Sequence, residues 1–169
     1  MNKNTLRAWT LFVNGGTRLE GAHEYTPPEM SVIKVDIRTG GMDMAAPVDD
    51  GMEAMSCSFK IYGLDADALA LFGMQVGSSF PRLTAYEGYQ FTGGRFGRIE
   101  EMEGIITKIT PDARPNSNLG EASLTLEMSL NYYRATLDGV ELFEIIPEQF
   151  VRRVNGVDVL ADLRSKVRI

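Results

Sequence analysis

The chain has 169 residues, of which 44 % are apolar and 24 % are charged, and its formal net charge is −6. This length fits one domain, residues 1–169, that can bury its own core, and the composition is ordinary for a globular protein. The acidic balance argues against sequence-specific nucleic-acid binding, because phosphate contacts need clustered Lys and Arg.

The sequence contains no apolar run of the eighteen or more residues that a membrane span needs. Its N-terminus does not match a signal peptide, since the apolar stretch there is short and interrupted. We therefore expect no membrane insertion by the chain and assembly in the cytoplasm. Cys57 is the single cysteine, which excludes an internal disulfide and predicts a small buried apolar residue.

The first half of the chain alternates apolar and polar residues, as strands with one buried face do. The segment "TLFVNGG" predicts a short strand that ends in a turn at Asn14-Gly15. The segments "MSVIKVDIR" and "AMSCSFKIY" predict two further strands, which we expect to pair as a hairpin. Their polar faces carry Lys34, Asp36 and Arg38, and Ser56, Ser58 and Lys60, respectively.

The connection between these two strands, residues 38–54, is longer than the two to five residues usual for a hairpin. Loops of this length inside compact domains tend to be functional. It carries two methionines that favour a partner surface. Its acidic residues Asp43, Asp49, Asp50 and Glu53 lack the spacing of an EF-hand loop, so we expect no metal there. The loop residues of interest are Gly40, Gly41, Met42, Asp43, Met44, Pro47, Asp49 and Asp50.

A helix is predicted over residues 65–73, with Asp65 as its N-cap and Gly73 as its stop. Its apolar side, which should pack on a sheet, carries Leu64, Ala68, Leu71 and Phe72. Further strands are predicted at "RLTAYEGYQF" and "RIEEMEGIITKI".

The longest alternating segment begins at residue 122 and extends to residue 137. One face reads Leu124, Leu126, Met128, Leu130, Tyr132, and the other reads Thr125, Glu127, Ser129, Asn131, Tyr133. At about 3.3 Å per residue this strand would span roughly 50 Å, about twice a typical strand or more. Such a strand either bends around a core or belongs to a sheet that continues beyond one subunit. Asp138-Gly139 predicts a tight hairpin turn to the return strand "VELFEII", and the tail predicts a turn and a short basic helix.

The residues offer little that could catalyse a reaction. His23 is the single histidine, and the sequence has no nucleophile-elbow motif. The segment "TGGRFGR" lacks the phosphate-loop pattern and predicts a turn with two exposed arginines. Glu100, Glu101 and Glu103 are interpreted as a solvated cluster rather than catalytic carboxylates. We expect no enzyme activity, no metal and no cofactor.

Together these patterns predict a mainly β fold, an antiparallel sandwich or barrel-like subunit with one packed helix and an extended hairpin loop. Ordered motifs then point to a family: "LFVNG" near the start, the Gly-Gly-Met loop "RTGGMDMAAPVDDGMEAM", and the C-terminal "YYRATLDGVELFEIIPEQFVRRVNGVDVLADLR". This ordered set closely resembles the major tail tube proteins of contractile-tailed bacteriophages and of the related R-type pyocins.

The resemblance implies hexameric rings stacked into a helical tube inside a contractile sheath, in a virion tail assembled in the bacterial cytoplasm. The implied partners are other copies of the chain, the tail sheath protein, baseplate and tail terminator proteins, the tape measure protein and passing DNA. The loop of residues 40–51 would reach the neighbouring ring. The polar faces would line the lumen, through Lys34, Asp36, Ser56, Ser58, Thr125, Glu127, Ser129 and Asn131.

A small acidic and polar lining would let DNA slide, because DNA carries about one negative charge per 1.7 Å of its axis. Lys34, Arg38 and Lys60 temper this interpretation. The main alternative is a monomeric β-sandwich that binds a ligand, and a hydrolase is the third hypothesis. A tube of a secretion system, or of a headless bacteriocin, also stays open at this point.

Overall fold

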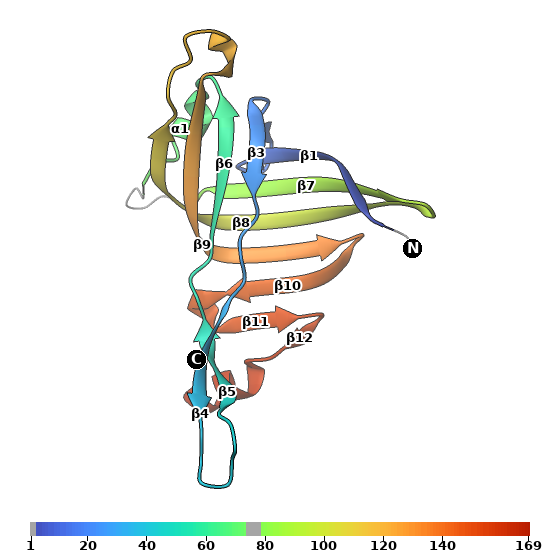
Figure 1. Cartoon of the computed structure of the whole chain (residues 1–169), viewed down its shortest axis with the longest axis vertical. Coiled ribbons are helices and arrows are strands. Elements are labelled where there is room, and N and C mark those ends of the chain that lie inside the picture. The colour runs from blue at the N-terminus through green and yellow to red at the C-terminus, as the bar shows by residue number, and fades with distance from the viewer. Residues whose placement is uncertain (1–2, 74–78) are drawn as a thin grey trace.

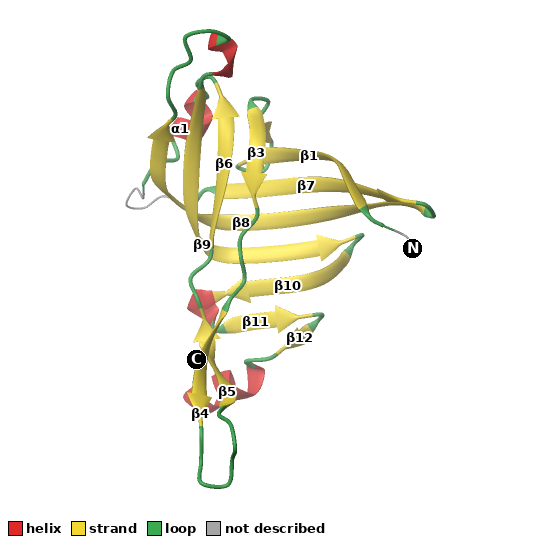
Figure 2. Ribbon diagram, in the orientation of Figure 1, coloured by secondary structure: helices red, strands yellow, loops and turns green. Residues whose placement is uncertain are grey.

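The computed structural model describes residues 3–73 and 79–169. In this part of the chain, antiparallel strands dominate and two short α-helices are present (Figures 1 and 2). The strands are β1 (Thr5–Val13), β2 (Thr17–Arg18), β3 (Ala22–Thr26), β4 (Val32–Ile37), β5 (Ala46–Met52), β6 (Ser56–Tyr62), β7 (Arg82–Phe91), β8 (Gly94–Pro111), β9 (Ser123–Leu137), β10 (Val140–Ile146), β11 (Val151–Val154) and β12 (Val157–Asp158). The helices are α1 (Ala66–Leu69) and α2 (Ala161–Val167), with 3-10 turns at Leu119–Glu121 and Pro147–Gln149. The predicted antiparallel β class is therefore confirmed.

Strands β8 and β9 organise the fold, because each belongs to two parts of the sheet. In the transverse region the order is β12-β11-β10-β9-β8-β7-β1-β2, using the first half of β8 and the second half of β9. In the four-stranded region the other halves of β8 and β9 continue beside β6, and β6 pairs with β3. Figure 1 shows that the strands of these two regions run in clearly different directions.

The bend between the two regions lies at Gly104 in β8 and Asn131 in β9. Asn131 is the extra residue of a β-bulge, because pairing steps from Tyr132 to Leu130 while β8 advances by one residue. A Cβ atom on Gly104 would lie 1.9 Å from the Ser129 carbonyl oxygen. Glycine is therefore required for this close approach of two backbones.

The bulge reverses which residues of β9 face the core. Leu126 and Met128 are buried before it, whereas Tyr133 and Ala135 are buried after it. Tyr132 lies on the opposite face and is only partly buried. The unbroken alternation predicted for this strand, with Tyr132 on the apolar face and Tyr133 on the polar one, is wrong because it assumed a strand without a bulge.

The core joins side chains from both regions of the sheet. Its buried members include Leu11 and Val13 from β1, Phe59 and Ile61 from β6, Leu83 and Ala85 from β7, Met102 and Ile106 from β8, and Leu126 and Met128 from β9. Cys57 belongs to the same cluster, as expected from the sequence, and burial raises the pKa of its thiol to about 12. Burial of this apolar area stabilises the packing of the two regions, which β8 and β9 also connect directly.

The hairpin predicted from "MSVIKVDIR" and "AMSCSFKIY" is wrong in its pairing. Strand β4 pairs with β5, which lies inside the segment predicted to be an extended loop, and β6 pairs with β3 and β9. Strand β5, "APVDDGM", contains Pro, Asp and Gly, which strands generally disfavour, so its sequence gave no strand signal. The resulting β4–β5 hairpin projects from the rest of the chain with its connection, residues 38–45, at the tip (Figure 1).

Helix α1 is shorter than the predicted 65–73. Asp65 is its N-cap as predicted, and the Oδ1 atom of Asp65 accepts hydrogen bonds from the backbone N–H groups of Asp67 and Ala68 at 3.0 and 3.3 Å. Ala68 is buried, but Leu64 and Phe72 are exposed, which contradicts the predicted packing of both side chains. The predicted basic helix of the tail exists as α2.

The edges of the sheet stay open within the described residues. The transverse region ends at β12 and β2, and the four-stranded region has β3 at one side. The described part of the subunit thus forms no closed barrel by itself. Among the same residues, no helix is long and apolar enough to cross a membrane.

Candidate functional site

One face of the four-stranded region carries the small polar residues predicted from the sequence. Pairing of β6 with β9 places Ser56 opposite Ser129, Ser58 opposite Glu127 and Lys60 opposite Thr125. The intervening residues, Cys57 and Phe59 among them, are buried on the opposite face. We call the outer face of β3, β6, β9 and β8 in this region the polar face.

Charges on the polar face are mixed. Lys60 Nζ lies 3.1 Å from Glu24 Oε2 on β3, and Lys108 on β8 is the cross-strand neighbour of Glu127. Beyond the end of β8, Asp112 accepts hydrogen bonds from Ser123 Oγ at 2.8 Å and from Thr125 Oγ1 at 3.3 Å. The Ser123 hydrogen bond, followed in effect by the charge of Lys60, holds the pKa of Asp112 below its usual range. The polar face therefore carries mostly small polar side chains, and its positive and negative charges nearly balance.

Three of the residues predicted to share this surface lie elsewhere. Lys34 and Asp36 are on β4, in the projecting hairpin, where Lys34 Nζ lies 3.6 Å from Asp36 Oδ2. Asn131 is in the bulge, and its Oδ1 atom is buried without a hydrogen-bond partner among the described residues.

The β4–β5 hairpin has one charged face and one apolar face. On the charged face, Lys34 is the cross-strand neighbour of Asp49. The carboxylate of Asp49 accepts a hydrogen bond from Arg152 Nη2 of β11 at 2.9 Å, which joins this face to the C-terminal strands. The opposite face is apolar, and each of its large side chains is between 42 % and 47 % exposed. These are Ile33, Val35, Ile37 and Val48.

The predicted loop residues divide between the tip of this hairpin and its second strand. Gly40, Gly41, Met42, Asp43 and Met44 lie in the connection, and Pro47, Asp49 and Asp50 lie in β5. Arg38 Nε donates a hydrogen bond to the carbonyl of Met42 at 3.2 Å, and Met44 is 75 % exposed. At the far end of the sheet, Asp138 and Gly139 adopt positive φ angles of 51° and 84° and join β9 to β10.

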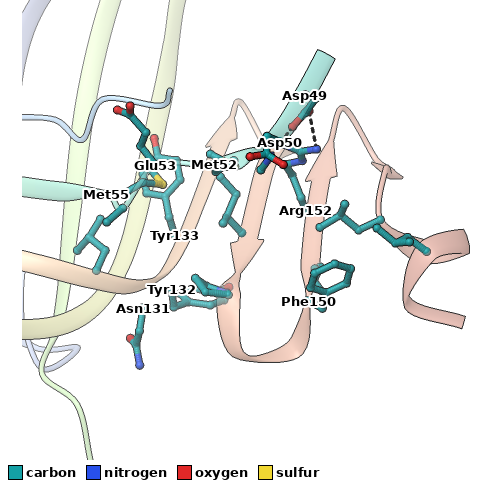
Figure 3. A pocket seen from close by; sticks show the side chains of 18 residues that line it. Asp49, Asp50, Met52, Glu53, Met55, Asn131, Tyr132, Tyr133, Phe150 and Arg152 are labelled. Carbon is teal, nitrogen blue, oxygen red and sulfur yellow. Dashed lines mark hydrogen bonds and ion pairs between the residues drawn. The ribbon is translucent and has the colours of Figure 1, made fainter. Parts of the chain in front are cut away.

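A groove of about 800 Å³ separates the base of the hairpin from the C-terminal strands (Figure 3). Its walls come from β5 and the following residues, from β9 around the bulge, from β10 and β11, and from the start of α2. The apolar lining includes Met52, Met55, Leu130, Phe150 and Leu163, and the rim on the hairpin side carries Asp49, Asp50 and Glu53.

The structure also contains a buried ionic cluster that sequence reasoning missed. Glu100 is fully buried, and its carboxylate accepts hydrogen bonds from Arg98 Nη1 at 2.9 Å and from Tyr133 Oη at 2.8 Å. Glu87, almost as buried, accepts from the same Arg98 nitrogen at 3.3 Å and from Tyr89 Oη at 2.8 Å. Burial raises the pKa of Glu100, although the Tyr133 hydrogen bond and the Arg98 charge act to lower it.

Two expectations are corrected by this cluster. Glu100 does not belong to a solvated group with Glu101 and Glu103, which lie on the other face of β8 beside Arg134 and Arg82. Arg98 is not exposed at the turn, because it reaches the two buried carboxylates. The sequence did contain a signal for this cluster. Alternate residues of a strand lie on the same face, which places Arg98 and Glu100 on the face of the core residue Met102.

Little in this arrangement could perform covalent chemistry. The ring of His23 stacks on Tyr62 with centroids 3.7 Å apart and an interplanar angle of 6°. In residues 3–73 and 79–169, no group of three His, Cys, Asp or Glu side chains has the geometry to hold a metal ion. The notable features are therefore surfaces: the polar face, the apolar face of the hairpin and the groove.

Comparisons with known proteins agree with the view that the chain acts through its surfaces. A family model described as phage tail tube protein FII matches residues 3–167. The tail tube protein of Escherichia phage P2 is 28 % identical over 178 residues, covering 96 % of this chain and 95 % of that protein. The major tail tube protein of Serratia phage KSP20 is 27 % identical over 160 residues, covering 93 % and 91 % of the two chains.

Proposed function

The chain belongs to the phage tail tube protein FII family, a family of structural proteins, and from this premise we propose that it forms hexameric rings that stack into the tube of a contractile tail. The tube would conduct DNA, or the effector of a phage-like particle, during ejection. Its partners would be other copies of the chain and the tape measure protein inside, the sheath protein outside, and baseplate and terminator proteins at its ends. The alternative, a monomeric β-sandwich that binds a ligand, gives no reason for the exposed apolar face of the β4–β5 hairpin.

The observation that carries this proposal is the exposed apolar face of the β4–β5 hairpin. The charged face of the hairpin is joined to its own subunit through Asp49 and Arg152, so the apolar face around Val35 and Val48 points away from that contact. Monomeric proteins rarely leave a contiguous apolar surface on a projecting element. A second copy that covered this face would gain about 25 cal/mol for each Å² of apolar area buried. We propose that the hairpin, with residues 40–51, makes this contact with the neighbouring ring.

The open edges of the four-stranded region suggest how a ring would close. Strand β3 forms one edge, and the second half of β8, from Lys108 to Pro111, forms the other. Among the described residues, neither edge has a further strand partner there. Pairing β3 of one subunit with β8 of the next would satisfy both sets of backbone groups and join the regions into a barrel.

In such a barrel the polar face would line the lumen, with Ser56, Ser58, Thr125, Glu127 and Ser129 as lining residues. Hydroxyl groups and paired charges offer DNA no row of cations to hold its phosphates. Lys34, Asp36 and Asn131 are left out of this lining, because the structure does not place them beside the other five residues.

The test is negative-stain electron microscopy of the purified protein over a range of concentrations. We expect uniform hollow tubes or six-fold rings. The double variant Val35→Asp/Val48→Asp should raise the concentration needed for assembly at least tenfold. Lys34→Asp, which changes the net charge by the same amount on the other face of the hairpin, should have a much smaller effect.

A protein that stays monomeric even with an initiating baseplate complex would contradict the proposal and favour the ligand-binding alternative. Equal assembly by both variants would show that the apolar face of the hairpin is not an assembly surface.

A further inference from the structure

The groove at the base of the hairpin has an acidic rim that its own chain leaves mostly uncompensated. Arg152 pairs with Asp49, but none of the ion pairs in the described part of the chain involves Asp50 or Glu53. Both residues are exposed, and they line the same groove as the apolar side chains of its walls. An occupant that fits this groove would combine apolar side chains with positive charge.

The C-terminal segment of the same chain has this combination. Lys166 and Arg168 make no ion pair among the described residues, and Val167 and Ile169 are 53 % and 70 % exposed. The segment therefore presents two cations and two apolar side chains within four consecutive residues.

Contacts within one chain hold this segment away from its own groove. Arg164 Nη1 donates to the Phe150 carbonyl at 3.0 Å and lies 2.9 Å from Asp158 Oδ2, which fixes α2 against β12 and the residue before β11. Leu160 and Leu163, at the start of α2, already form part of the groove wall, whereas Val167 and Ile169 stay exposed. An occupant with this chemistry would therefore come from a second chain.

We propose that the groove of one subunit receives residues 166–169 of a second copy, with Lys166 and Arg168 beside Asp50 and Glu53. The contact joins two different surfaces, so it is heterologous and can repeat from copy to copy, as rings and helical stacks require. The inference rests on the proposed self-assembly and adds to it a contact separate from the apolar face of the hairpin.

Charge reversal tests the contact. Lys166→Glu/Arg168→Glu should raise the concentration needed for tube formation at least fivefold, and Asp50→Lys/Glu53→Lys should do the same. The four substitutions in one chain should restore assembly to within twofold of the unmodified protein. Lys3→Glu/Arg114→Glu is the matched control, because it reverses two exposed cations elsewhere and changes the net charge equally.

A cross-linking experiment measures the same contact directly. In a Cys57→Ser background, a chain with Glu53→Cys is mixed during assembly with a longer, tagged chain that carries Ile169→Cys. Oxidation should give a disulfide-linked heterodimer of distinct size. Glu121→Cys in place of Glu53→Cys should not, because Glu121 is exposed on the turn Leu119–Glu121 and does not line the groove.

The outcomes separate this inference from the proposed function. Normal tubes from the tail variant, failure of the four-substitution chain to recover, or tubes without the cross-link would each overturn the inference while the tube assignment stands. If the unmodified protein forms no polymer with an initiating complex, the proposed function fails and the inference fails with it.

Discussion

Gly104 and Glu100 lie four residues apart on β8, and each has a property that is unusual for its position in a strand. Gly104 allows the backbones of β8 and β9 to approach at the bulge, and Glu100 places a carboxyl group inside the core. The first property is steric and the second is electrostatic. They therefore lead to different predictions at the residue scale.

Gly104→Ala should destabilise the subunit by about 3 kcal/mol or more, because the new methyl group would overlap the Ser129 carbonyl oxygen. Urea unfolding of the unassembled subunit measures this difference. Gly40→Ala, at a position with open space around it, should change the stability by less than about 0.5 kcal/mol. Equal stability of both variants would show that the bulge adapts without strain.

Glu100 should make the stability of the subunit depend on pH above the ordinary glutamate pKa of about 4.3. Its pKa in the folded state is raised, chiefly by burial, so the folded protein binds this proton more tightly than the unfolded chain does. Stability from this group is therefore present at acidic pH and falls as pH rises through the folded-state pKa.

Glu100→Gln should remove this dependence and keep a hydrogen bond to Tyr133. Relative to the variant, the unmodified protein should be most stable below about pH 4.3 and should lose that advantage progressively as the pH is raised from there toward about 8. Melting temperatures over this range test the prediction, with Glu148→Gln, an exposed position, as the control. A constant difference between the two proteins would contradict it.

At the scale of secondary-structure elements, the hairpin is an attached element rather than part of the core. Its backbone hydrogen bonds lie within β4 and β5, and Asp49 with Arg152 joins it to β11. Elements with few buried contacts open locally at a lower free energy than the core. The hairpin should therefore move more than the remaining strands in an unassembled subunit.

Arg152→Ala should speed amide hydrogen exchange in β4 and β5 at least threefold while leaving the exchange of β8 and β9 unchanged. Arg153→Ala is the control, since the neighbouring Arg153 pairs with Glu144 on the other face of the sheet. The backbone N–H of Gly51, followed by Arg152, lowers the pKa of Asp49, so the contribution of this carboxylate is lost as pH falls. Unchanged exchange in the hairpin of the Arg152→Ala variant would show that other contacts hold it.

Element types were more predictable than element partners. Alternation identified β6 and β9, and the tight turn at Asp138-Gly139 identified β10 as the strand that returns from β9. The pairing of β4 with β5 was missed because Pro47, Asp49 and Asp50 are poor strand formers, and β5 is stabilised by its partner rather than by its own sequence. The bulge at Asn131 was missed because the adjacent Tyr132 and Tyr133 hide the point at which the alternation changes phase, although Ala135 and Leu137 already follow the new phase.

The candidate surfaces show the same difference: the sequence indicates which residues share a face of one strand, but not which strands lie side by side. Ser56, Ser58, Thr125, Glu127 and Ser129 were found from the sequence because their strands are neighbours with matching period. Lys34 and Asp36 share that period but belong to another sheet, and period alone carries no information on which strands pair. The groove depends on three distant segments, so no single stretch of sequence could predict it.

For the whole molecule, the proposed lumen gives a prediction about DNA passage. Glu127→Lys would place a third cation beside Lys60 and Lys108 in each subunit, which multiplies around a ring into a phosphate-binding belt. Particles with this variant should release DNA at least twofold more slowly, and added salt should reduce the difference. Glu148→Lys, an exposed position on the 3-10 turn before β11, is the control.

Release rates from single particles measure this effect. An unaltered rate for Glu127→Lys would contradict the lumen assignment of the polar face, whereas the family assignment would stand.

The passage of β8 and β9 through both regions of the sheet has a mechanical consequence. In two separately packed sheets, a force that pulls one layer from the other is resisted only by side-chain contacts. Here the same force acts along two continuous polypeptides, and the ladder between them is loaded in shear, with many hydrogen bonds resisting together. A subunit built in this way would pass a load from one region to the other through covalent bonds, which would help a tube of such subunits to keep its shape.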